Sequence, residues 1–157
     1  MRALIQRVRE GHVAIGGEVR SRIGRGYVIL LGIRQGDTTE DAKSLADKCA
    51  RLRVMEDAGG RMNLALPDVG GSALVVSQFT LYGDAQRGNR PGFTDAARPA
   101  EAEPLYAGFV ARMREVLGTE RVLTGEFGSM MEVLIANDGP VTILIESPSS
   151  HTTTRNA

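Results

Sequence analysis

The sequence predicts a single α+β domain that is rich in β-structure, with a mixed or antiparallel sheet and two main helices. Short apolar runs bounded by Gly, Pro, Asn and Asp indicate strands, the clearest at residues 27–33 and 72–81. Two longer segments, near residues 37–50 and 101–117, repeat apolar residues at helical spacing. A length of 157 residues corresponds to one domain. We place that domain at residues 1–147 and expect residues 148–157 to form a polar, disordered tail.

The first part of the chain is predicted to consist of strands. Residues 2–9 form the first one. Residues 12–15 and 18–23 form a hairpin around Gly16-Gly17, because two glycines suit a tight turn. Residues 27–33 are apolar on both faces, which is typical of a central strand.

The first helix is expected to begin near Asp37, because residues 37–41 supply N-cap candidates and early acids that suit the helix dipole. Its apolar stripe contains Cys49, so we interpret this cysteine as a packing residue. After the helix we expect a short strand, a turn and an alternating strand that ends at Pro67; they occupy residues 51–55, 57–60 and 62–66.

The second helix is predicted over residues 101–117, after a long polar loop. Residues 82–98 are rich in Gly, Arg, Asn, Asp and Pro, and loops of that length in a compact domain are usually functional or mobile. Pro104 is tolerated only in the first turn of a helix, so regular helix should begin close to it. Two short strands are expected to follow, at residues 121–123 and 131–135.

A polar turn separates the last two apolar runs. Residues 137–142, Asn-Asp-Gly-Pro-Val-Thr, lie between residues 133–136 and 143–145, which predicts a hairpin. Gly139 has no Cβ, so another group can approach its backbone closely. Pro140 fixes its own φ and gives the preceding peptide a chance of being cis, about 5% in folded proteins. Together they could present two rigid, outward-facing carbonyl groups.

The composition excludes several classes of function. Nineteen basic and nineteen acidic residues cancel, so no overall field indicates a nucleic-acid partner. No apolar run approaches the roughly 20 residues that a membrane span needs, and we expect a cytoplasmic protein. The single cysteine excludes an intrachain disulfide, and with only His12 and His151 beside it no zinc site is expected. We expect no cofactor.

Two polar motifs at strand ends remain as candidates for chemistry. Ser77-Gln78-Phe79-Thr80 interrupts an apolar run, and a strand edge that emerges into solvent explains it as well as a binding motif does. The other motif is the turn of residues 137–142. Neither supplies a strong general base, so an enzyme built on them would rely on positioned backbone groups and on its substrate.

Ser77-Gln78-Phe79-Thr80-Leu81, followed by Asn137-Asp138-Gly139-Pro140-Val141-Thr142, resembles the paired signature of the D-aminoacyl-tRNA deacylase family. The resemblance covers about residues 1–146; further similar segments are Ala3–Val8, Met62–Leu64, Arg87–Pro91 and Gly125–Gly128. This chain departs from the family's pattern at Gly92, at Ser129-Met130 and at Pro104, all outside the two signatures.

The resemblance implies a homodimer with active sites at the subunit interface, and a reaction that hydrolyses the ester bond of D-aminoacyl-tRNA. Gly139 and Pro140, joined by a cis peptide, would face Ser77 to Thr80 of the partner subunit, and Arg7 would brace this turn. An L side chain would clash with the turn, whereas a D side chain would point away from it. Glycyl-tRNA, which has no side chain, would also be a substrate.

The same resemblance implies a role for each remaining residue of the site. Phe79, Phe127 and Met131 would surround the terminal adenosine of the tRNA. Gln78 and the backbone amides of Phe79 and Thr80 would orient the ester and stabilise its oxyanion. The ribose 2′-hydroxyl would assist hydrolysis, so that Thr80 acts through its main chain and not as a nucleophile.

Two other classes of function compete with this interpretation. A non-catalytic nucleic-acid binding domain would use the arginine-rich residues 2–25 and an exposed Phe79, but the neutral net charge disfavours it. A threonine-dependent esterase or amidase would use Thr80 and needs a base for it.

Overall fold

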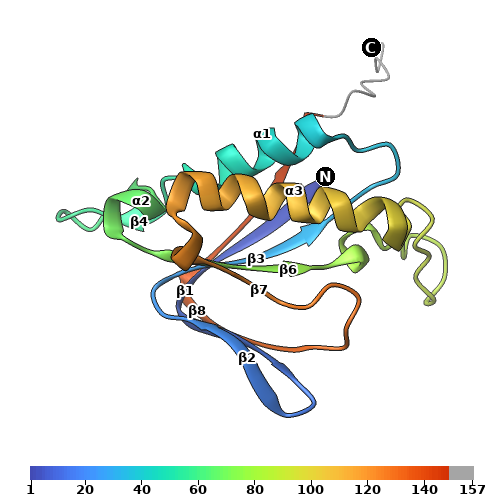
Figure 1. Ribbon diagram of the computed structural model, residues 1–157, viewed down its shortest axis with the longest axis horizontal. Coiled ribbons are helices and arrows are strands. Elements are labelled where there is room, and N and C mark those ends of the chain that lie inside the picture. The colour runs from blue at the N-terminus through green and yellow to red at the C-terminus, as the bar shows by residue number, and fades with distance from the viewer. Residues whose placement is uncertain (149–157) are drawn as a thin grey trace.

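The computed structural model describes residues 1–148, in which a strongly curved sheet carries two long helices on one face (Figure 1). In chain order the elements are β1 (Arg2–Ile15), β2 (Glu18–Ile23), β3 (Gly26–Gly32), α1 (Thr39–Ala50), β4 (Met55–Glu56), β5 (Met62–Leu64), α2 (Leu66–Val69), β6 (Ser72–Ser77), the 3₁₀ helix η1 (Phe79–Tyr82), α3 (Pro99–Leu117), the 3₁₀ helix η2 (Thr119–Arg121), β7 (Val122–Thr124) and β8 (Glu132–Glu146). The predicted α+β class is confirmed, and the predicted tail lies almost wholly outside the described residues.

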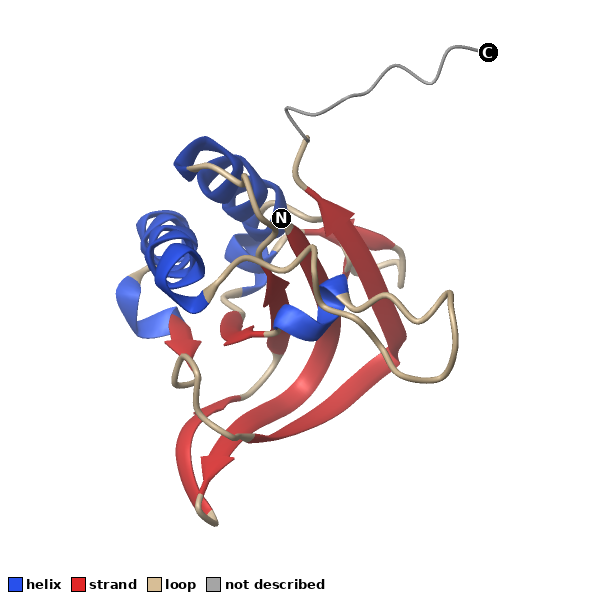
Figure 2. Ribbon diagram, turned by 90° about the vertical axis from the view of Figure 1, so that its right-hand side faces the viewer, coloured by secondary structure: helices blue, strands red, loops and turns tan. Residues whose placement is uncertain are grey.

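Strand β1 has partner strands along both of its edges. It pairs antiparallel with β8 along one edge, and with β3 and then β2 along the other. Strands β3 and β6, and then β6 and β7, are parallel, so the sheet is mixed. The Ser21 hydroxyl of β2 donates to the Thr124 carbonyl of β7 at 2.8 Å. This bond joins the first and last strands of the order β2-β1-β3-β6-β7, so the sheet curls toward a barrel (Figure 2).

The curl gives the domain two apolar clusters. One lies between the helices and the sheet and includes Tyr27, Ile29 and Phe109. The other lies on the opposite face of the sheet and includes Val28 and Leu74. Neighbouring residues of β3 thus enter different clusters, as side chains that alternate across a strand must. The prediction of a central strand at residues 27–33 is confirmed.

Helix α1 begins as its sequence predicts. Thr38 is the N-cap and forms a capping box with Asp41, in which each side chain accepts a hydrogen bond from the other residue's backbone N–H. Cys49 is fully buried, and burial raises the pKa of its thiol to about 12. It is a packing residue, as predicted. No helix among residues 1–148 is long and apolar enough to cross a membrane.

Two predicted boundaries in the helical segments are wrong. Helix α3 begins at Pro99, so Pro104 lies inside it rather than at its start. Pro104 leaves the carbonyl of Ala100 without its helical N–H partner, and this is tolerated where Ala100 is exposed to solvent. The strand predicted to run to residue 66 ends at Leu64, because the Asp68 carboxylate accepts from the Ala65 N–H at 2.8 Å and starts the short helix α2.

The N-terminal segment is also more continuous than predicted. Residues 2–9 and 12–15 belong to one strand, β1, because Gly11 stays paired with Ile23 of β2 and Ile135 of β8. A Cβ on Gly11 would lie 2.7 Å from Val28 Cγ2, so only glycine lets the strand pass this close to β3.

The hairpin predicted around residues 137–142 is wrong. The two apolar runs are halves of a single strand, β8, and both halves pair antiparallel with β1. Thr142 pairs with Gln6 and Asn137 pairs with Val8, so residues 138–141 form an excursion from the strand opposite Arg7. The chain direction does not reverse, because β1 continues past the excursion and supplies partners on both sides of it.

Candidate functional site

A pocket of about 640 Å³ lies where β3 and β6 end. It is enclosed by η1, by the segment that enters α3 and by the segment that enters β8. Its lining residues are Leu31, Ile33, Val76, Ser77, Gln78, Phe79, Phe93, Ala96, Ala97, Pro99, Ala102, Phe127, Gly128, Ser129, Met130, Met131 and Val133. Most of this surface is apolar.

The start of η1 places Phe79 in the lining of this pocket, with Thr80 next to it in sequence but outside the lining. Strand β6 ends at Ser77, so the prediction that a strand continues to residue 81 is wrong. The Gln78 N–H donates to the Leu31 carbonyl at 2.8 Å, and the chain then turns away from the sheet. A Cβ on Gly32 would lie 3.1 Å from the Gln78 carbonyl oxygen, so this glycine lets η1 pack against the end of β3.

Aromatic rings form two sides of the pocket. Phe79 is 57% exposed, and its ring meets the edge of Phe93 with centroids 5.1 Å apart. Phe127 packs on Tyr106 with centroids 5.6 Å apart. Such offset and edge contacts stabilise aromatic pairs beyond their burial. Phe93 was not predicted as a site residue; the available signal was that it is the only phenylalanine in the polar segment of residues 83–98.

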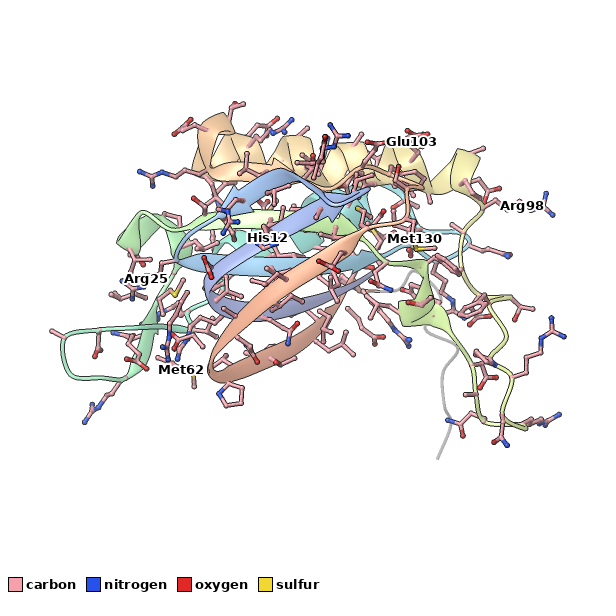
Figure 3. All side chains as sticks on the ribbon, turned by 90° about the horizontal axis from the view of Figure 1, so that it is seen from below. His12, Arg25, Met62, Arg98, Glu103 and Met130 are labelled. Carbon is pink, nitrogen blue, oxygen red and sulfur yellow. The ribbon has the colours of Figure 1, made fainter. Side chains whose placement is uncertain are left out.

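Met131 completes the pocket from the entry to β8. A Cβ on Gly125 would lie 2.6 Å from Met131 Sδ, so the absence of a side chain at Gly125 makes room for this thioether. The neighbouring Met130 is 91% exposed and also lines the pocket (Figure 3). The structure therefore brings Ser77, Gln78, Phe79, Phe127 and Met131 together around one cavity.

Among residues 1–148, none of the side chains that line the pocket is acidic or basic. The side-chain amide of Gln78, which lines the pocket, donates to the hydroxyl of Thr80, which is exposed and does not line it. His12 lies on β1, paired with Arg22 and Leu134, and does not line the cavity. Within residues 1–148 the pocket thus offers amides, hydroxyls and apolar surface, and no side chain in its lining can act as a general base at neutral pH.

The second motif is held by a buried arginine. Arg7 is 5% exposed, and its Nη1 donates to the Val54 carbonyl at 2.9 Å. Its Nε lies 3.3 Å from both the main-chain carbonyl oxygen and Oδ2 of Asp138, and its Nη2 lies 3.3 Å from Glu56 Oε1. A guanidinium with several acceptors in fixed directions holds the excursion of β8 against the body of the domain.

Asn137 closes the excursion from the other side. Its Nδ2 donates to the carbonyls of Arg7 and Val141, both at 3.0 Å, and so satisfies groups that the interrupted ladder leaves without strand partners. Gly139 has φ of +123°, the Gly139-Pro140 peptide is cis, and both residues are exposed.

Within one chain the two motifs stay apart. Arg7, beside the excursion, pairs with Tyr27 of β3, whereas Leu31 of the same strand lines the pocket. Four residues along a strand correspond to roughly 13 Å. Gly139 and Pro140 are absent from the lining of the pocket. One chain therefore contains both halves of the predicted site without joining them.

Comparison with known proteins identifies the family. The family model for D-Tyr-tRNA(Tyr) deacylase matches residues 4–146. A D-aminoacyl-tRNA deacylase from Symbiobacterium thermophilum is 56% identical over 94% of this chain and 96% of that protein, and one from Thermus aquaticus is 55% identical over 94% and 95%. A solved structure named c-Myc DNA Unwinding Element Binding Protein superposes with a TM-score of 0.90 at 41% identity, covering 95% of this chain and all of that one. The chain belongs to the D-aminoacyl-tRNA deacylase family.

Proposed function

We propose that the chain hydrolyses the ester bond of D-aminoacyl-tRNA and releases a free D-amino acid and tRNA. One observation carries the proposal. The pocket combines exposed aromatic and methionine surface with the start of η1, and its lining within residues 1–148 contains no ionisable side chain. Such a site suits a nucleoside ester whose own groups take part in the reaction.

The terminal adenosine is the part of the substrate that the pocket holds. Phe79, Phe127 and Met131 offer apolar faces to the base, and stacking of a base on an aromatic ring contributes about 1–3 kcal/mol. The adenosine would then place its esterified ribose near the Gln78 amide and the Thr80 main chain.

Catalysis depends on backbone hydrogen-bond donors at the start of η1 and not on a side-chain nucleophile. Phe79 and Thr80 open η1, and the first N–H groups of a helical turn have no partner within that turn. These amides stabilise the oxyanion that forms on the ester carbonyl, while Gln78 orients the ester. Water attacks the ester carbonyl, the bond from the carbonyl carbon to the ribose oxygen breaks, and the leaving ribose oxygen takes a proton. The neighbouring ribose 2′-hydroxyl assists this step, since within residues 1–148 the lining offers no base that could activate Thr80 as a nucleophile.

Stereochemical selection is assigned to the excursion of β8 from a second subunit. Gly139 and Pro140 are exposed and firmly braced by Arg7, yet they are far from the pocket of their own chain. In a homodimer, the turn of one subunit would cover the pocket of the other and hold the substrate's amino group with main-chain carbonyls. An L side chain would meet this wall, whereas a D side chain or the hydrogen of glycine would not.

The test compares D-, L- and glycyl-tRNA prepared on the same tRNA. We expect rapid hydrolysis of the D and glycyl esters and at least a hundredfold slower hydrolysis of the L ester, a difference of about 2.7 kcal/mol in transition-state free energy. Equal rates for D and L esters would disprove stereochemical selection. A rate no faster than the spontaneous reaction with all three would disprove the activity.

A second candidate is nucleic-acid binding without catalysis. It is favoured by one observation, the 41% identity to a solved structure that is named for binding DNA. This alternative requires that DNA of the named kind binds as tightly as tRNA and that no ester is cleaved. The same hydrolysis assay therefore separates the two functions.

A further inference from the structure

The loop of residues 83–98 borders the pocket, and most of its residues are exposed to solvent. Residues 83–95 are all exposed. Phe93 belongs to this loop and lines the pocket, so whatever enters the pocket passes beside the loop. The deacylase reaction proposed above gives this loop no role.

The root of the loop is fixed at two levels. Asp84 and Gly92 exchange both backbone hydrogen bonds at 2.8 Å, which closes residues 85–91 into a separate tip. Below this pair, the Gln35 N–H donates to the Asp95 carbonyl at 3.0 Å and the Ala97 N–H donates to the Ile33 carbonyl at 2.9 Å. The loop is therefore held in place relative to the pocket.

Charges in the loop are unbalanced, although the chain as a whole is neutral. Its two carboxylates are engaged: Asp84 accepts from the Gln86 N–H at 2.8 Å, and Asp95 pairs with Arg34 at 3.1 Å. Arg87, Arg90 and Arg98 are exposed. Within residues 1–148, none of these three guanidinium groups forms an ion pair with a carboxylate.

We propose that Arg87, Arg90 and Arg98 bind the phosphates of the RNA strand whose terminal nucleoside occupies the pocket. The proposal rests on the proposed function, because it takes the 3′ end of tRNA as the ligand. A guanidinium fork matches the geometry of a phosphate, and a fixed loop root lowers the entropy lost on binding. Contacts of this kind position the strand without reading its sequence. They would feed the ester into the pocket from the side of Phe93.

The test measures two quantities for the wild type and for R87A/R90A/R98A. One is the equilibrium binding of uncharged tRNA, and the other is kcat and KM for D-aminoacyl-tRNA and for a D-aminoacyl ester of adenosine alone. The matched control is Arg25→Ala, because Arg25 is also an exposed arginine without a carboxylate partner in residues 1–148 and lies on the opposite side of the molecule from Arg98 (Figure 3). Single alanine variants at residues 87, 90 and 98 measure how much each arginine contributes to tRNA binding.

The expected size of the effect on tRNA affinity comes from its dependence on salt concentration. Three contacts to single-stranded phosphates give a slope of about −2 for log affinity against log salt, so raising the salt fourfold should weaken wild-type binding roughly 20-fold more than binding by the triple variant. At low salt, we expect R87A/R90A/R98A to have a higher KM for the tRNA substrate than the wild type and an unchanged kcat. The adenosine ester, which carries no phosphate, should be hydrolysed equally by both proteins, and R25A should behave as wild type.

Each contrary outcome has a separate meaning. If the triple variant binds tRNA as tightly as wild type with the same salt slope, or if wild type binds no tRNA, the loop does not hold phosphates. Equal losses on the tRNA and the adenosine ester would show that the substitutions damage the pocket, which also overturns the proposal. If wild type binds tRNA in a loop-dependent manner but cleaves no ester, the proposed function fails and the phosphate site stands.

Discussion

Gly139 and Arg7 are the residues on which the proposed stereochemical selectivity depends, and both can be tested by single substitutions. A Cβ at Gly139 would lie 2.8 Å from Val141 Cγ2 and 3.0 Å from Val141 N, at a φ of +123° that L side chains rarely adopt. We expect Gly139→Ala to lose D-aminoacyl-tRNA hydrolysis without gaining L hydrolysis. Arg7→Ala frees the excursion and should raise the ratio of L to D hydrolysis, at a stability cost of about 1–3 kcal/mol because the buried Val54 carbonyl loses its hydrogen-bond donor.

These two variants are compared by the D to L ratio on one tRNA and by thermal unfolding. Arg9→Ala serves as the control for Arg7, because Arg9 also pairs with Asp138 but is exposed on the surface. Rapid cleavage of the L ester by Gly139→Ala would show that a side chain elsewhere reads the stereocentre.

Thr80 is the residue most easily mistaken for a nucleophile. Its hydroxyl accepts a hydrogen bond from the Gln78 amide, which cannot remove a proton from it. We therefore expect Thr80→Ala to keep most of the wild-type kcat, within about tenfold, measured as deacylation of D-aminoacyl-tRNA with the fold checked by circular dichroism. A loss of about a thousandfold, or an acyl group trapped on Thr80, would assign it a covalent role.

At the scale of elements, the start of α1 makes stability depend on pH. Burial acts to raise the pKa of Asp41, but hydrogen bonds from the Thr38 hydroxyl and N–H, with the nearby N-terminal ammonium, outweigh it and hold the pKa below its usual range. A lowered folded-state pKa stabilises the fold above the unfolded value of about 4, and this contribution is lost as the pH falls through the folded-state pKa. Thr38→Ala should cost about 0.5–2 kcal/mol at neutral pH and flatten the loss of stability below pH of about 4, measured by urea unfolding across that range.

Elements with local signals were the predictable ones. Helix α1 was predicted from N-cap candidates, early acids and an apolar stripe, and β3 was predicted from a run that is apolar on both faces. The course of β8 was not predictable in this way, since Asn-Asp-Gly-Pro suits a hairpin as well as an excursion. What decides between them is pairing with β1, including the bond from Asn137 to the Arg7 carbonyl across 130 residues of chain.

The residues of the candidate site likewise fall into those that a local motif indicates and those that only the tertiary structure brings to the pocket. The motifs indicate the segment of residues 77–80 as one of two candidates, and Ser77, Gln78 and Phe79 of this segment line the pocket, whereas Thr80 does not. The motifs do not bring Phe127 and Met131 to it; that prediction came from the family resemblance, and both residues line the pocket. Phe93 was missed because its place depends on the backbone pair between Asp84 and Gly92, which no local pattern indicates.

At the scale of the whole molecule, the separation of the two motifs predicts that the active species is a dimer. Each subunit keeps its pocket and its braced turn apart, so two subunits would complete two sites by exchanging turns. Light scattering at assay concentrations should give twice the mass of one chain. Mixing an inactive Gly139→Ala chain with a chain disabled in the pocket by Phe79→Ala should restore part of the activity, because one site in each mixed dimer contains no substitution. A fully active monomer would contradict this arrangement.

The backbone pair between Asp84 and Gly92 also determines where a protease can cut this loop. It leaves residues 85–91 as an exposed tip with both ends fastened, and such tips are preferred sites of nicking. Trypsin should cut after Arg87 and spare Arg90, since Pro91 follows it. The two fragments should remain associated, because the cut falls between Asp84 and Gly92 and each fragment keeps one of these two fastened ends. If RNA phosphates cover the tip, tRNA should slow this single cut in a dose-dependent manner, and the rate of cutting would report where the strand lies even on a chain that has already released its product.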